Sequence, residues 1–91
     1  MSDYKFIKDY DRLKELLDGG ETVICLADYK VDGLAFRDIC KGVKKEDYYS
    51  FYARGIEYCR FYPNYYKRYP EKYPKTFAEM MEKHNIEFLD K

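Results

Sequence analysis

The segment from Tyr48 to Pro74 holds nine of the chain's twelve tyrosines and all three of its prolines. Proline lacks a backbone donor and disfavours the α conformation in the residue before it, so regular structure must be interrupted near Pro63 and Pro70. Leu, Ile, Val and Phe supply only 20 of the 91 residues, close to the lower limit for chains that fold. Tyrosine rings must therefore form part of the core, because each one removes a large area from water.

A single domain, residues 1–91, is expected, because a chain of this length forms one hydrophobic core of marginal size. The charged N-terminus lacks the apolar run of a signal peptide, and no segment has the roughly 18 apolar residues that a membrane span needs. Cys25, Cys40 and Cys59 are odd in number and widely spaced, which is typical of free, buried thiols in a reducing compartment. We expect a cytoplasmic protein without a membrane partner.

Regular structure is clearest near the two ends of the chain. Residues 9–18 predict a helix with Asp9 or Asp11 as N-cap and its leucines on one stripe, which the Gly19-Gly20 pair ends. Residues 22–29 are nearly continuously apolar and predict a buried strand. Thr76 and Glu79 are spaced as a capping box, so a helix is expected from there to Asn85. Short strands are expected at 4–7 and 86–89.

The segment 33–43 fits either a helix or a strand. Asp32-Gly33 is a hairpin signal when both flanking runs are strands. Helical spacing is nevertheless present in the apolar residues Phe36, Ile39, Cys40 and Val43. Gly42 suits a helix end, and Asp38 interrupts the alternation of a strand. The pattern therefore favours a helix.

The segment 45–61 poses the same choice. A hairpin with its turn at 53–55 agrees with the high β propensity of tyrosine. That arrangement would mix Ser50, Glu57 and Arg60 with rings on the same faces. A helix instead collects one apolar stripe, formed by Tyr49, Tyr52, Ala53, Ile56 and Cys59. We therefore predict a helix over 45–61, followed by a short helix over 63–69 and an exposed connector over 70–75.

These elements predict an α+β fold in which three to four helices pack on a small sheet of two to four strands. The sheet is expected to contain 22–29, together with 4–7 and 86–89. No repeat, linker or second domain is apparent in the sequence.

Familiar catalytic arrangements are missing from the sequence. The chain has one histidine, His84, which lies where a helix end explains it, and only two serines. Cysteine and histidine are too scattered for a zinc site, and Gly19-Gly20 follows a helix, the reverse of the order in a phosphate-binding loop. Carboxylate pairs occur at helix starts, but nothing selects one of them as catalytic. We expect no enzyme activity, no metal and no cofactor.

The tyrosine-rich segment carries the clearest bias toward binding. Residues 48–75 contain six basic and two acidic residues, a net charge of +4, and the remaining residues carry −4. Tyrosine and arginine are enriched in recognition surfaces because they combine large contact area with hydrogen bonding. The predicted binding residues are Tyr58, Arg60, Tyr62, Tyr65, Tyr66, Lys67, Arg68, Tyr69 and Tyr73.

Two classes of partner fit that surface. The leading hypothesis is a non-enzymatic protein-binding module, including an inhibitor of another protein with an acidic or mixed surface. The alternative is a binder of nucleotides or single-stranded nucleic acid, in which the rings stack bases and Arg60, Lys67 and Arg68 meet phosphates. A net charge of zero favours a protein partner, because general nucleic-acid binders carry a basic excess.

In small size, neutral charge, free cysteines and tyrosine-rich face, the chain resembles small phage accessory proteins, among them inhibitors of bacterial immunity. The resemblance is one of general character and rests on no aligned residues. It implies a protein partner and an anti-defence role.

Overall fold

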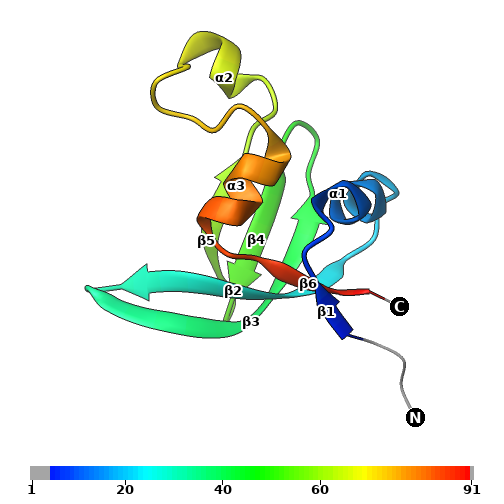
Figure 1. The fold of residues 1–91 in the computed structure, drawn as a ribbon, viewed down its shortest axis with the longest axis vertical. Coiled ribbons are helices and arrows are strands. Elements are labelled where there is room, and N and C mark those ends of the chain that lie inside the picture. The colour runs from blue at the N-terminus through cyan, green and yellow to red at the C-terminus, as the bar shows by residue number, and fades with distance from the viewer. Residues whose placement is uncertain (1–4, 91) are drawn as a thin grey trace.

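The computed structural model describes residues 5–90, which form six strands and three helices (Figure 1). In chain order these are β1 (Lys5–Ile7), α1 (Tyr10–Asp18), β2 (Val23–Val31), β3 (Leu34–Lys44), β4 (Tyr49–Ala53), β5 (Ile56–Phe61), α2 (Tyr65–Arg68), α3 (Phe77–Lys83) and β6 (Glu87–Asp90). The strands form one antiparallel sheet in the order β1-β6-β2-β3-β4-β5.

The predicted fold class is wrong in its proportions. Strands account for 44% of the residues and helices for 23%, so a six-stranded sheet dominates, in place of three to four helices on a small sheet. The two long segments predicted as helices, 33–43 and 45–61, are strands and hairpin turns. They double the size of the expected sheet.

The helix at the N-terminus and its caps agree with the sequence prediction. The Asp9 carboxylate accepts a hydrogen bond from the backbone of Arg12 at 3.1 Å. At the other end Gly20 has a φ of 88°, and its amide donates to the carbonyl of Leu17 at 3.0 Å. A left-handed residue that closes a helix in this way favours glycine, which has no Cβ to clash.

Two tight turns explain why both ambiguous segments form hairpins. Asp32 and Gly33 have φ values of 51° and 81°, and Arg54 and Gly55 have 54° and 78°. Two successive left-handed residues are characteristic of the type I′ turn, whose twist matches that of the flanking strands. The turns join β2 to β3 and β4 to β5, so the predicted helices over 33–43 and 45–61 are corrected to strand pairs.

Gly42 provides space within the sheet and does not end a helix. It lies opposite Phe51 on the neighbouring strand, and a Cβ there would come within 2.7 Å of the phenyl ring. A larger residue would have to displace Phe51, which is fully buried.

The polar residues that argued against a hairpin in 45–61 bond to one another on the outer face of the sheet. The Ser50 hydroxyl and the Arg60 guanidinium both donate to the carboxylate of Glu57. Hydrogen bonds of this kind remove the cost of placing polar groups beside aromatic rings. A register shift between Phe51 and Tyr52 also breaks the simple alternation along β4 and β5.

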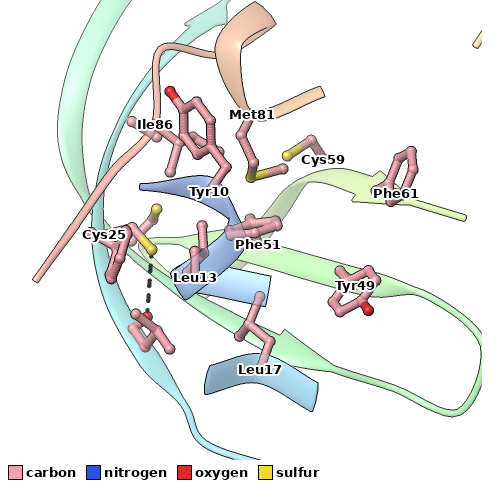
Figure 2. Close-up of a cluster of buried hydrophobic side chains, with 14 of the residues drawn as sticks. Tyr10, Leu13, Leu17, Cys25, Tyr49, Phe51, Cys59, Phe61, Met81 and Ile86 are labelled. Atoms are coloured by element: carbon pink, nitrogen blue, oxygen red, sulfur yellow. Dashed lines mark hydrogen bonds between the residues drawn. The ribbon is translucent and has the colours of Figure 1, made fainter. Parts of the chain in front are cut away.

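The core lies between the sheet and the helices α1 and α3, which both cover its inner face (Figure 1). Figure 2 shows Leu13 and Leu17 of α1 directed toward Phe51 of the sheet, with Met81 of α3 beside them. All four side chains are fully buried. Tyrosine contributes as expected, because Tyr10 and Tyr49 are also buried in this cluster.

The three cysteines are free and buried, which confirms that part of the prediction. Cys25 and Cys40 face each other across β2 and β3. Burial raises the pKa of Cys59 to about 12, and the adjacent Cys40 thiol together with burial raises the pKa of Cys25. Cys25 and Cys59 therefore stay protonated and covered, and such thiols react slowly.

The C-terminal elements follow the sequence prediction with one change. The Thr76 hydroxyl accepts from the amide of Glu79 at 3.1 Å, but the Glu79 carboxylate bonds to the amide of Lys75 instead of that of Thr76. Asn85, with a φ of 49°, ends α3. The strands β6 and β1 correspond to 86–89 and 4–7, and Tyr4 lies outside the described residues.

Candidate functional site

Most of the predicted binding residues lie in a projection that we call the tyrosine lobe, residues 62–75. It contains α2 and lies beyond the ends of β4 and β5, away from α1 (Figure 1). The predicted helix over 63–69 is only one turn, Tyr65–Arg68, and the chain then returns through Pro70 and Pro74 to α3. No residue of the lobe belongs to the main core.

Rings of the tyrosine lobe cover one another. Tyr62 and Tyr65 stack with their centroids 4.2 Å apart and their planes at 8°. Tyr65 also meets Tyr73 at 5.1 Å and Tyr69 at 6.2 Å, in edge-to-face contacts. Tyr48 continues the row on the other side of Tyr62, at 4.8 Å. The lobe is therefore a small aromatic cluster with Tyr65 at its centre.

The outer surface of the lobe is basic and partly aromatic. Arg68 and Lys72 line a hollow of about 400 Å³ together with Tyr65, Tyr69 and Tyr73. Tyr69 and Tyr73 are 45% and 42% exposed. Among residues 5–90, ion pairs involve none of the lobe cations Lys67, Arg68, Lys72 and Lys75. With Glu71 as the one acidic residue of the lobe, its net charge is +3.

Two predicted site residues do not belong to this surface. Arg60 binds the Glu57 carboxylate, which raises the pKa of the guanidinium, and it also covers the ring of Tyr48 at 4.7 Å. Arg60 donates to the Tyr62 hydroxyl at 2.9 Å, so it joins the lobe to the sheet. Tyr58 is half-buried at the opposite end of β5, with its hydroxyl 3.5 Å from the Cys40 sulfur.

Tyr58 lines a second surface, which we call the hairpin groove. The sequence analysis did not predict this surface. The groove is a hollow of about 910 Å³ whose wall includes Tyr29, Val31, Phe36, Ile56, Tyr58 and His84. It exists because β2 and β3 extend beyond the sheet as a two-stranded ribbon (Figure 1). β4 pairs with β3 only at Cys40–Lys44, and β6 pairs with β2 only at Cys25 and Leu26.

Aromatic rings form a continuous row along the hairpin groove. Phe36 stacks on Tyr29 at 5.6 Å, and Tyr29 meets Tyr58 at 5.6 Å. His84, the C-cap residue of α3, touches Tyr58 edge-on at 5.8 Å, and burial followed by the charge of Lys83 lowers the pKa of its imidazole. In the sequence, the apolar residues Val31, Leu34 and Ile56 beside the two turns are the signal that could have indicated this surface.

Comparison with known proteins gives no matching family model, no matching curated protein and no matching solved structure. In the described range no group of three or more His, Cys, Asp or Glu residues is arranged to hold a metal ion. None of the helices within residues 5–90 is long and apolar enough to cross a membrane.

Proposed function

We propose that this chain is a non-enzymatic protein-binding module that docks on an acidic surface of its partner through the tyrosine lobe. The observation that carries the proposal is the hollow in which Arg68 and Lys72 accompany three tyrosine rings. Cations beside a rigid aromatic surface suit a partner that offers carboxylates around an apolar contact. A partner bound in this way can be inhibited simply because its own surface is covered.

Ring packing in the lobe favours a protein over unstacked bases. A base needs a free ring face on which to stack. In the tyrosine lobe Tyr62 and Tyr65 already cover each other, and Tyr65 also meets Tyr69 and Tyr73. The edges and hydroxyls that remain are better suited to contacts with a protein surface. Nucleotide or single-stranded nucleic-acid binding is the alternative that the salt titration below tests.

The cellular location that we propose is the cytoplasm. Three free, buried thiols suit a reducing compartment, where disulfides rarely form. An anti-defence role, as in the phage proteins that the chain resembles, is one form that such binding could take.

A matched pair of charge reversals tests the proposal. The tagged protein is used to capture partners from an extract of the source cell, beside Arg68→Glu/Lys72→Glu and the control Lys5→Glu/Lys41→Glu. The control removes the same charge from exposed positions on the sheet. We expect the lobe variant to lose the captured protein and the control to retain it. Equal capture by all three proteins would overturn the proposal.

A salt titration separates the two classes of partner. Binding of the captured partner is measured across salt concentrations for the wild type and Arg68→Ala. We expect a shallow dependence, because an interface with aromatic anchors relies only in part on charge. Phosphate contacts instead give a steep slope that falls by about one when one contact is removed. That steep slope would make nucleic acid the better answer.

A further inference from the structure

We propose that the hairpin groove is a second binding site, separate from the tyrosine lobe, and that it takes a compact apolar molecule with one anionic group. The lobe and the groove share no residue, so this proposal stands independently of the protein-binding function. A volume of about 910 Å³ is within the range of small-molecule pockets, which are lined mainly by apolar side chains.

The apolar character of the site is built into the sheet. The two rings of Tyr29 and Phe36 lie on the inner face of the ribbon, at paired positions of β2 and β3. The helices α1 and α3 cover this face over the core but leave it open along the ribbon (Figure 1). Aromatic side chains therefore remain accessible on a face that elsewhere in the sheet is buried.

Exposed aliphatic side chains extend the same surface. Ile56 in the wall is 71% exposed and Val31 49%, and Leu34 at the tip of the ribbon is 64% exposed. Monomeric proteins rarely gather large apolar residues at one exposed place unless something binds there. An apolar ligand would remove this surface from water.

Charges at the groove favour an anion. Asp28 and Glu57 line the hollow, but Asp28 binds Arg37 and Asn85, and Glu57 binds Ser50 and Arg60. Arg54 is held by Asp38 at 2.6 Å while it lies over the Phe36 ring. The acids of the wall are thus already neutralised by partners within the protein.

Two lysines of the wall remain available. Lys30 and Lys83 form no ion pair with any residue between 5 and 90. Both contribute atoms to the wall of the hollow, Lys30 from β2 next to Tyr29 and Lys83 from the end of α3. One anionic group on an otherwise apolar ligand would complement them, and its rings or chain would lie against Tyr29 and Phe36.

Two dyes that share their rings but differ in charge test whether the groove binds apolar rings and whether the lysines bind an anionic group. Anilinonaphthalene sulfonate is apolar with one sulfonate, and phenylnaphthylamine has the same rings without it. The fluorescence of each dye gives its affinity for the wild type and for Lys30→Gln/Lys83→Gln. We expect the double variant to bind the sulfonate about fivefold more weakly. Its affinity for the neutral dye should be unchanged. An equal loss for both dyes, or no loss, would contradict the role of the lysines.

Two exposed isoleucines, one in the wall of the groove and one outside it, test whether the apolar wall binds the dyes. Ile56→Ser removes an aliphatic side chain from the wall, and Ile39→Ser removes one that is 57% exposed on the opposite face of the sheet. We expect Ile56→Ser to weaken both dyes about tenfold and Ile39→Ser to weaken neither. Equal effects of the two variants would overturn the proposal of a small-molecule site.

Self-association of the protein would also overturn it, if the association competes with the dyes and is lost in Leu34→Ser. In that case a second copy of the chain would fill the groove.

Discussion

The tyrosine lobe and the hairpin groove both lie beyond the core and both contain stacked aromatic rings, but the side chains around those rings differ. In the lobe, Tyr62 and Tyr65 stack on each other and leave mainly cations and ring edges outside. In the groove, Tyr29 and Phe36 also stack, but the exposed aliphatic side chains of Val31 and Ile56 lie beside them and leave an apolar surface open to solvent. The lobe is therefore suited to a charged protein surface and the groove to a small apolar molecule.

The contrast teaches that the density of tyrosine along the chain does not locate the exposed apolar surface of the hairpin groove. Rings that are close in sequence, such as Tyr62 and Tyr65, can cover each other within one turn of chain. Exposed apolar residues collect instead where strands extend past their neighbours, at Val31 and Leu34.

The largest expected effect separates a ring that supports the fold from a ring that does not. Tyr58 contacts Phe51, Tyr29 and His84, so Tyr58→Ala should lower the free energy of unfolding by about 3 kcal/mol. Tyr69→Ala, in the lobe and 45% exposed, should cost only about 1 kcal/mol, because Tyr69 meets only Tyr65 and Tyr73 among the aromatic rings of residues 5–90. Urea unfolding followed by circular dichroism measures both. Equal costs would mean that the lobe is as integral to the fold as the sheet.

A second, smaller effect concerns the centre of the lobe. Tyr65 meets Tyr62, Tyr69 and Tyr73, and each aromatic pair contributes about 0.5–1 kcal/mol, so Tyr65→Ala should destabilise the lobe by about 2 kcal/mol. Amide hydrogen exchange should rise within 62–75 and stay slow in the core. Tyr66→Ala is the control, since Tyr66 makes no ring pair within the described residues. Faster exchange across β2 and β3 would show that the lobe is not an independent cluster.

Asp18 in the body of the protein is bonded to a tyrosine and a lysine, and the dependence of stability on pH reports what these bonds contribute. The Tyr49 hydroxyl donates to the Asp18 carboxylate at 2.5 Å, and Lys14 binds it at 2.9 Å, which lowers the pKa of Asp18 to about 2. The unfolded pKa is about 3.9, so this stability is present above about pH 4 and is lost as the pH falls toward 2.

Asp18→Asn should therefore cost about 1 kcal/mol near neutral pH, a figure reduced for solvent screening of a partly exposed group. The cost should shrink steadily as the pH falls from about 4 to 2, where wild-type Asp18 is about half protonated. Asp47→Asn, an exposed control in the connection between β3 and β4, should match the wild type throughout. A difference that persists unchanged to pH 2 would show that the carboxylate charge is not the cause.

The smallest effect on stability is expected from the lobe cations. Lys67→Ala/Arg68→Ala/Lys72→Ala should change the free energy of unfolding by no more than about 0.5 kcal/mol, because these side chains form no ion pair with residues 5–90. The same variant should lose the partner. A marked loss of stability would assign the cations a structural role instead.

Local signals allowed some elements to be predicted from the sequence. Asp9, Gly20 and Thr76 act through hydrogen bonds or backbone conformations within a few residues, so their caps were correctly recognised. The prediction failed for the two hairpins: Asp32-Gly33 was a local turn signal, but the contacts that remove the objections to strands are non-local. Ser50 and Arg60 are tolerated beside rings only because Glu57 lies across the hairpin, and Gly42 is explained only by Phe51 on another strand.

The candidate sites also differ in whether local sequence signals or non-local contacts define them. Pro63 and Pro70 indicated a segment that is hard to bury, and the tyrosine lobe does lie outside the core. The hairpin groove joins Tyr29, Ile56 and His84 from distant parts of the chain, so the sequence shows apolar residues beside the turns but not that they meet. Tyr58 was assigned to the binding segment by sequence proximity, but it faces the groove.

Hydrogen exchange of the protein with and without its captured partner tests the division between the two regions most directly. The account predicts slower exchange in 65–73 when the partner is bound, and unchanged exchange in the ribbon at 29–36. Slower exchange confined to 29–36, with none in 65–73, would contradict it and make the hairpin groove the protein-docking surface.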